Sequence, residues 1–231
     1  MTIRHFACGL LTVLAIGSPM TLQAEPLVVV ELYTSQGCSS CPPADAYLVE
    51  LANNPSLMPL ALHVDYWDYI GWADTFADPA FGRRQSAYAQ AVGSRTVYTP
   101  QMIVGGVDRV EGNNPVAIDA LILMHQKNAP LVTLDVARNG DTLAISASGA
   151  VTGPVDVAVV RYVPSELVAI TRGENAGHSV AYRNIVTAWD IVGQWSGQGP
   201  LQMEATVSGA QAVVVILQKP GPADVVAAAR P

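Results

Sequence analysis

The stretch that decides the fold is Tyr33-Thr34-Ser35-Gln36-Gly37-Cys38-Ser39-Ser40-Cys41-Pro42-Pro43. It follows an apolar run, residues 27–30, and precedes a segment with helical spacing. A Cys-x-x-Cys pair where a strand gives way to a helix is the sequence form of a dithiol redox centre. The positive end of the helix dipole stabilises a thiolate there. We therefore expect Cys38, at the tip of the loop, to attack and the more buried Cys41 to resolve the mixed disulfide.

Outward from this stretch, the chain shows two different patterns of predicted secondary structure, one up to residue 128 and one after residue 130. Over residues 27–128 the pattern predicts strand–helix–strand–helix–strand–strand–helix, with the first two strands parallel and the last two antiparallel. The predicted elements there are strands at 27–33, 58–65, 98–106 and 107–110 and helices at 41–53, 79–91 and 115–127. After Ala129-Pro130 the pattern changes to short strands without long helical periodicity, as in an antiparallel sheet or a small sandwich. These strands are predicted at 131–137, 142–148, 155–163, 201–207 and 211–218, with a hairpin turn at Asn139-Gly140-Asp141.

Composition and the first residues indicate an exported globular protein. Half of the 231 residues are apolar, 13% are charged, and the formal net charge is −7. There is no basic run, so we expect no nucleic-acid partner. Residues 1–24 have the pattern of a secretory signal peptide, with an apolar stretch at 6–17 that is too short for a comfortable membrane span. Removal of this segment removes Cys8 and leaves Cys38 and Cys41 as the only thiols, in a periplasmic or secreted protein without a stable membrane span.

The order of elements in residues 27–128 resembles the thioredoxin fold, with the cysteine pair after its first central strand. The whole mature chain also resembles a group of secreted bacterial proteins that is classed as a domain of unknown function and is built on a thioredoxin-like core. Four motifs carry this second resemblance: residues 33–45, His63-Val64-Asp65-Tyr66-Trp67-Asp68, Tyr98-Thr99-Pro100-Gln101 and Arg172-Gly173-Glu174-Asn175-Ala176-Gly177. The expected fold is an α/β thioredoxin-like domain over 25–128, a β-rich, sandwich-like domain over 129–222 and a C-terminal tail, 223–231.

The resemblance to thioredoxins implies roles for individual residues. Thr99 and Pro100 stand where that family carries a cis-proline that faces the disulfide and binds the substrate chain. Glu31 stands where the family carries a buried acid, which would accept the proton of Cys41. The aromatic segment 66–72 is either a lid packed on the core or a hydrophobic wall for substrate, in which Trp67 would take part.

Other interpretations of the cysteine pair stay open at this stage. It can be half of a metal site, but zinc needs two further ligands, and His63, His125 and His178 show no paired spacing. Copper with a histidine or Met102 as an extra ligand is a second possibility, and an inert structural disulfide is a third. The loop with Arg172, Glu174, Asn175 and His178 is either a hydrogen-bonded connection between strands or a polar cluster that serves the site.

Taken together, the sequence predicts an exported protein resembling thiol–disulfide oxidoreductases, without a dissociable cofactor. Its catalytic residues would be Cys38, Cys41 and Glu31, its substrate-binding residues Thr99, Pro100 and Trp67, and no metal would be bound. Its partner would be a protein or a small thiol or disulfide. The alternative is a copper- or zinc-binding or protein-interaction module that keeps the scaffold without turnover.

Overall fold

The computed structural model describes residues 27–128 and 131–231. The predicted signal peptide, 1–24, and the predicted junction at Ala129-Pro130 lie outside the described residues. The elements follow in this order: β1 (Val28–Thr34), α1 (Pro42–Leu51), β2 (Leu57–His63), the 3₁₀ helix η1 (Asp68–Ile70), α2 (Pro79–Ala91), β3 (Gln101–Val104), β4 (Asp108–Glu111), α3 (Pro115–Lys127), β5 (Val132–Asn139), β6 (Thr142–Gly149), β7 (Val155–Ala169), β8 (Ser179–Trp195), β9 (Leu201–Thr206), β10 (Ala212–Gln218) and β11 (Val225–Ala229). The predicted mixed α/β character is confirmed. None of the described helices is long and apolar enough to span a membrane.

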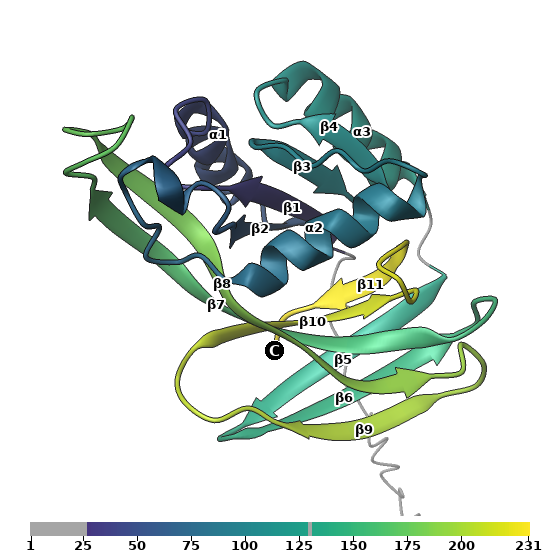
Figure 1. The fold of residues 1–231 in the computed structure, drawn as a ribbon. Helices are drawn as coiled ribbons and strands as arrows, with labels where there is room; N and C mark the ends of the chain where they lie inside the picture. The colour runs from purple at the N-terminus through teal and green to yellow at the C-terminus, as the bar shows by residue number, and fades with distance from the viewer. Residues whose placement is uncertain (1–26, 129–130) are drawn as a thin grey trace, which may run out of the picture.

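One large mixed sheet organises the molecule. It has eight strands in the order β11-β10-β7-β8-β2-β1-β3-β4, and a smaller sheet has the order β5-β6-β9 (Figure 1). As predicted, β1 and β2 are parallel and β3 and β4 are antiparallel. The helix between β1 and β2 explains the first pairing, because parallel strands need a crossover connection. The tight Gly105-Gly106 turn explains the second, and both glycines have positive φ.

The two faces of β1 enter different cores, because successive side chains of a strand point to opposite faces. Val28, Val30 and Leu32 pack with residues of α1 and α3. Val29 and Tyr33 pack on the other face in a cluster that includes residues of α2. Both helices on the first face therefore lie opposite α2, and any residue at an odd position of β1 is directed away from α1.

The chain after residue 130 contributes to both sheets. Strands β5, β6 and β9 form the smaller sheet, which packs on alternate residues of β7 and β10 in a core of its own. Strands β7, β8, β10 and β11 extend the larger sheet, where β8 joins β2 through the pair Ala61 and Ile185. The boundary predicted near residue 128 thus marks a change in sequence pattern, but strands from both sides of it belong to the larger sheet.

Two strands have no counterpart in the sequence-based prediction. The long strand β8 carries polar residues on both faces and a break in register against β7, so it lacks the alternation that marks a half-buried strand. Strand β11 lies within the predicted tail, 223–231, where its alanines pair with β10 at the edge of the sheet. The sequence of β8 therefore lacks the pattern of a strand, and that of β11 lacks it because alanine is depleted in strands.

Candidate functional site

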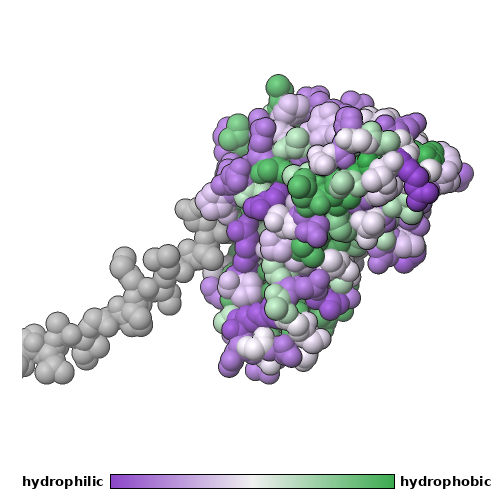
Figure 2. All heavy atoms as spheres, turned by 90° about the vertical axis from the view of Figure 1, so that its left-hand side faces the viewer, coloured by the Kyte–Doolittle hydropathy of each residue, from purple (hydrophilic) through white to green (hydrophobic). Residues whose placement is uncertain are grey.

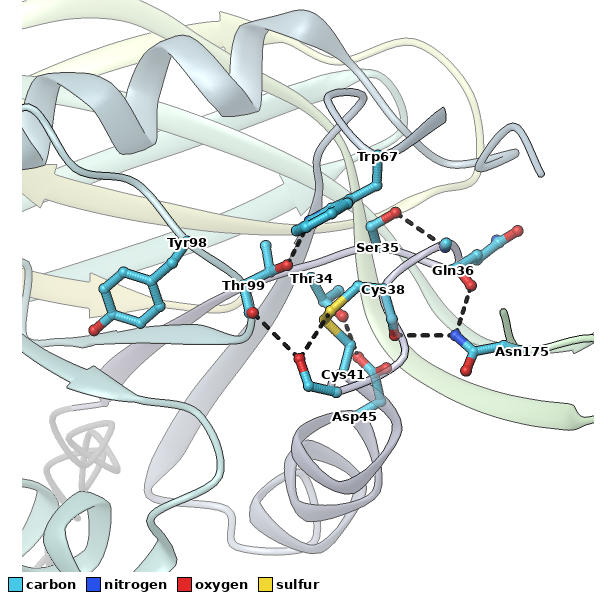
Figure 3. Close-up of a disulfide and its surroundings, with 12 residues drawn as sticks. Thr34, Ser35, Gln36, Cys38, Cys41, Asp45, Trp67, Tyr98, Thr99 and Asn175 are labelled. Atoms are coloured by element: carbon cyan, nitrogen blue, oxygen red, sulfur yellow. Dashed lines mark hydrogen bonds between the residues drawn. A yellow bond between two sulfur atoms is a disulfide. The ribbon is translucent and has the colours of Figure 1, made fainter. Parts of the chain in front are cut away.

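The site is built around a disulfide between Cys38 and Cys41, whose Cα atoms are 5.4 Å apart. The pair lies between the end of β1 and the start of α1, and Cys41 is the N-cap residue of that helix (Figure 3). Pro42 and Pro43 occupy the first turn, where a helix does not use the N–H that proline lacks. Cys38 is 3% exposed and Cys41 is fully buried, so Cys38 is the more accessible of the two.

The residues predicted to bind substrate lie beside this disulfide. The peptide bond between Thr99 and Pro100 is cis. Trp67 Nε1 donates to Thr99 Oγ1 at 2.7 Å, and Ser40 Oγ donates to the Thr99 carbonyl at 3.5 Å. The same Ser40 hydroxyl lies 3.4 Å from Cys38 Sγ. A chain of short contacts therefore connects the disulfide, the cis-proline loop and the indole (Figure 3).

One part of the aromatic segment, residues 66–72, contacts the cysteine loop, and another part is exposed to solvent. Trp72 Nε1 donates to Gln36 Oε1 at 2.7 Å, which fixes one end of the segment on the cysteine loop. Tyr69 is 79% exposed and its ring stacks on that of Trp67, with centroids 6.4 Å apart. Figure 2, which looks onto the side of the molecule with α1 and the β7–β8 hairpin, shows apolar residues gathered near the middle of a mostly polar face.

The predicted proton acceptor, Glu31, is engaged elsewhere. At an odd position of β1, it lies on the face opposite α1 and is fully buried. Both carboxylate oxygens accept hydrogen bonds from Arg84 of α2, at 2.8 Å each. The hydroxyls of Tyr33 and Tyr88 donate to the same carboxylate, at 2.8 and 2.6 Å. Burial, followed by the Glu31 charge, raises the pKa of Tyr33 and of Tyr88. The structure thus brings Cys38, Cys41, Thr99, Pro100 and Trp67 together and places Glu31 in a separate ion-paired cluster.

A different acid lies next to the cysteines. Asp45 follows Cys41 by one helical turn, its N–H donates to the Cys41 carbonyl at 3.0 Å, and it is 2% exposed. Residues four apart share one face of a helix, so its carboxyl group lies on the side of Cys41. Thr34 Oγ1 donates to Asp45 Oδ1 at 2.8 Å, whereas Oδ2 has no hydrogen-bond partner. Burial raises the pKa of Asp45 to about 7.

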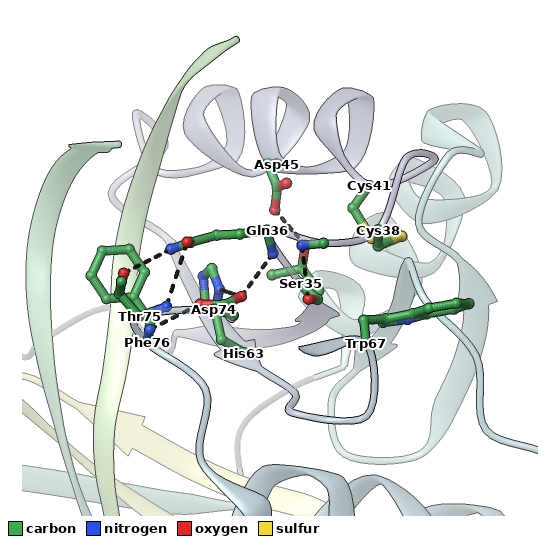
Figure 4. Close-up of polar contacts among 12 residues, drawn as sticks. Ser35, Gln36, Cys38, Cys41, Asp45, His63, Trp67, Asp74, Thr75 and Phe76 are labelled. Atoms are coloured by element: carbon green, nitrogen blue, oxygen red, sulfur yellow. Dashed lines mark hydrogen bonds and ion pairs between the residues drawn. A yellow bond between two sulfur atoms is a disulfide. The ribbon is translucent and has the colours of Figure 1, made fainter. Parts of the chain in front are cut away.

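A buried imidazole–carboxylate pair lies behind this acid (Figure 4). His63, at the end of β2, has its Nδ1 2.7 Å from Asp74 Oδ2, and both side chains are fully buried. The backbone N–H of Gln36 donates to the same Oδ2 at 2.7 Å, and the N–H of Phe76 donates to Oδ1 at 2.9 Å. The other ring nitrogen, His63 Nε2, has no hydrogen-bond partner.

The tip of the β7–β8 hairpin closes the site from the far half of the chain. Asn175 Nδ2 donates to the carbonyls of Gln36 and Cys38, at 2.9 and 3.0 Å, and Asn175 is 5% exposed. Gly173 has a φ of 78°, and a Cβ there would lie 3.0 Å from Cβ of Trp72. Of the four residues singled out in this loop, Asn175 thus connects the hairpin to the cysteine loop, whereas Arg172, Glu174 and His178 are exposed.

Two further features bear on the site around the disulfide, the grouping of metal-ligating side chains and the position of a cavity. Among residues 27–128 and 131–231, no three His, Cys, Asp or Glu side chains are grouped so that they could hold a metal ion. A cavity of about 800 Å³ lies between the end of α3 and β11, lined by His125, Val151 and Asp224 among others, and none of its lining residues belongs to the site.

Sequence reasoning missed two residues of the site, Asp45 and Asp74. The sequence does indicate the position of Asp45, because this residue follows Cys41 by four positions in a predicted helix and therefore lies on the same helix face as Cys41. It gives no such indication for Asp74, since Gln36, whose N–H it accepts, is 38 residues away along the chain. Only the folded structure brings such distant residues together.

Comparison with known proteins finds a family match and similar structures over most of the chain. The sequence pattern of one family, described as "Protein of unknown function (DUF1223)", matches residues 29–218. A crystal structure of a protein from Agrobacterium tumefaciens has 33% identity and a TM-score of 0.76, and the match covers 87% of this chain and 92% of that one. The structure of HBP35 of Porphyromonas gingivalis has 14% identity and a TM-score of 0.61, over 90% of this chain and 75% of that one, and is a likeness of fold alone. No curated protein matches the sequence.

Proposed function

Since this chain belongs to the DUF1223 family, whose description names no activity, we propose a function from the site itself: exchange between dithiols and disulfides. The observation that carries the proposal is a Cys38–Cys41 disulfide at the N-terminus of α1, in contact through Ser40 with the carbonyl that precedes a cis-proline. Ser39 and Ser40, which lie between the two cysteines, are exposed, so a substrate can approach the pair from that side.

The arrangement around the pair supports a thioredoxin-like domain at the N-terminal half. Strand β1 lies between parallel β2 and antiparallel β3, with α1 and α3 on one face and α2 on the other. This is the arrangement that resembles the thioredoxin fold. The N-terminal sequence pattern adds the proposal that the protein is exported to the periplasm or secreted, where a disulfide persists.

The proposed reaction uses the two cysteines in sequence. The thiolate of Cys38 attacks one sulfur of a substrate disulfide, which forms a mixed disulfide and releases the first substrate thiolate. Cys41 then attacks Cys38 Sγ, which forms the internal disulfide and releases the second thiolate. Two electrons pass from the dithiol to the substrate, and the substrate lies along Thr99, Pro100 and Trp67.

Reduction of insulin by the reduced protein tests this function. The wild-type protein is expected to reduce insulin catalytically with dithiothreitol as electron source, whereas Cys38→Ala loses turnover because the attacking thiolate is gone. Ser39→Ala is the matched control, since it alters an exposed neighbour and leaves both sulfurs in place. Equal turnover by wild type and Cys38→Ala contradicts the proposal.

A further inference from the structure

Two buried polar atoms behind the disulfide lack partners. They are Asp45 Oδ2, on α1, and His63 Nε2, at the end of β2. Leaving a buried polar group without a hydrogen bond costs about 1–3 kcal/mol, so an orphaned pair in one cluster calls for an explanation. The ring of His63 also packs edge-on against Phe76 and Tyr182, with centroids 5.2 and 4.9 Å away, which keeps the surroundings apolar.

The hydrogen bonds of Asp74 determine which atom of His63 is free to take a proton. Both oxygens of Asp74 accept backbone N–H groups, from Gln36 and Phe76, so this carboxylate acts as an acceptor. His63 Nδ1 therefore carries the hydrogen between it and Asp74, and in the neutral ring Nε2 is an acceptor. An ionised Asp45 is an acceptor too, so both orphaned atoms, Asp45 Oδ2 and His63 Nε2, are free to accept a proton.

Asp45 and His63 also interact electrostatically. Burial is the main cause that raises the pKa of Asp45 to about 7, and the imidazole of His63 is the strongest charge that lowers it. The groups that face Asp45 from the surrounding elements are Thr34 of β1, His63 of β2, Asp74 of the following loop, Tyr182 of β8 and Cys41 of its own helix. A group with a pKa near neutrality is well suited to take a proton and return it.

We propose that Asp45 and His63 form a proton-accepting pair that removes the thiol proton of Cys41 during exchange, with Asp74 fixing the imidazole. This inference rests on the proposed function and names its proton acceptor. Cys41 Sγ loses its proton to the pair, the resulting thiolate attacks Cys38 Sγ, the internal disulfide forms, and the thiolate of the substrate leaves. The two electrons of the dithiol pass to the disulfide substrate, and the pair returns its proton when the protein is reduced again.

A single-turnover reaction with dithiobis(nitrobenzoate) separates the two chemical steps. Attack by Cys38 on this aromatic disulfide releases one coloured thiolate, and attack by Cys41 then releases a second. In wild type we expect the rate of the second phase to rise with pH through a midpoint near neutrality. In Asp45→Asn that rise is lost and the second phase slows by roughly a hundredfold above neutral pH, the size of a typical general-base contribution, while the first phase is retained.

Two further variants sharpen the result. His63→Asn keeps a donor to Asp74 but removes Nε2, so the midpoint of the second phase is expected to move to higher pH because the imidazole lowers the Asp45 pKa. Glu50→Gln, an exposed change on the same helix, is the matched control and keeps the wild-type profile. An unchanged midpoint in His63→Asn removes His63 from the pair.

The outcomes distinguish this inference from the proposed function. Absence of the second phase in wild type contradicts thiol–disulfide exchange itself. Two phases in wild type with the same pH profile in Asp45→Asn overturn the role of Asp45 and leave the exchange reaction standing. If Asp45→Asn does not fold, as judged by circular dichroism, carbon-13 NMR titration of Asp45 in the reduced wild type and in Cys41→Ser decides: the midpoints are expected to differ, and identical midpoints overturn the inference.

Discussion

At the scale of single residues, Asp45 makes stability depend on pH in a direction opposite to that of most carboxylates. Its carboxyl group is 2% exposed, and burial raises its pKa from 3.8 to about 7. Between these two values the folded protein binds a proton that the unfolded chain has lost, so stability falls as pH rises through this window. The difference corresponds to roughly 4 kcal/mol.

Asp45→Asn is therefore expected to stabilise the protein increasingly as pH rises from about 4 to about 7, by up to roughly 4 kcal/mol relative to wild type. The asparagine oxygen still accepts from Thr34, so the hydrogen bond survives. Urea unfolding at several pH values measures this gain. Glu50→Gln, exposed on the same helix, is expected to change stability by less than about 0.5 kcal/mol, and a gain for Asp45→Asn that does not vary with pH would refute the argument.

At the scale of elements, the β7–β8 hairpin holds the cysteine loop in place through one side chain. Asn175→Ala leaves the buried carbonyls of Gln36 and Cys38 without that donor, and the expected loss of stability is about 1–3 kcal/mol. Hydrogen exchange of the backbone amides in residues 36–41 is expected to accelerate. His178→Ala, an exposed change in the same hairpin tip, is the control, and equal exchange in both variants would show that Asn175 does not hold the loop.

Elements with strong local patterns could be predicted from sequence, and those with irregular or alanine-rich patterns could not. The proline-led helices α2 and α3 begin at the predicted residues, because Asp78 and Asn114 accept backbone N–H groups as caps. The hairpin of β5 and β6 turns at Gly140-Asp141, as its turn residues predict. The strands β8 and β11 were missed because β8 lacks regular alternation and β11 is rich in alanine, which is depleted in strands.

The residues of the site also fall into those that the sequence predicted and those that it did not. The cysteine pair and its neighbours Thr99, Pro100 and Trp67 follow from motifs, and the structure brings them together. The acid next to Cys41 does not follow from the resemblance, because Glu31 occupies the opposite face of its strand. Alternation along β1 gives the physical reason: Thr34, the partner of Asp45, is three residues from Glu31 and so lies on the other face.

At the scale of the whole molecule, the Glu31 cluster joins the two halves of the chain. Arg84 bridges Glu31 of β1 and Gln218 of β10, both at 2.8 Å, and its guanidinium lies 3.5 Å from the ring centroid of Trp189 on β8. Burying an ion pair is costly unless its hydrogen bonds are complete, and here they are supplied from three elements, β1, α2 and β10. The cluster therefore couples α2 and the central strand to the C-terminal strands.

Glu31→Gln is expected to destabilise the protein by about 3–5 kcal/mol, because it leaves the charge of Arg84 without its counterion in a largely buried position. Asp190→Asn, which breaks the exposed pair with Arg161, is the control and is expected to cost less than about 1 kcal/mol. Chemical unfolding measures both. Similar costs for the two variants would show that the Glu31 cluster is no more than a surface ion pair.

The contact between Asn175 and the cysteine loop also bears on the order in which the molecule folds. Its two hydrogen bonds connect residues 139 and 137 positions apart, whereas the cysteines are separated by three. Contacts of such high sequence separation form late, because the entropy of closing a long loop is lost before the contact is gained. The hydrogen-bonded environment of the sulfurs is therefore complete only when the β7–β8 hairpin has docked on the cysteine loop, so the site depends on a part of the chain far from the cysteines in sequence.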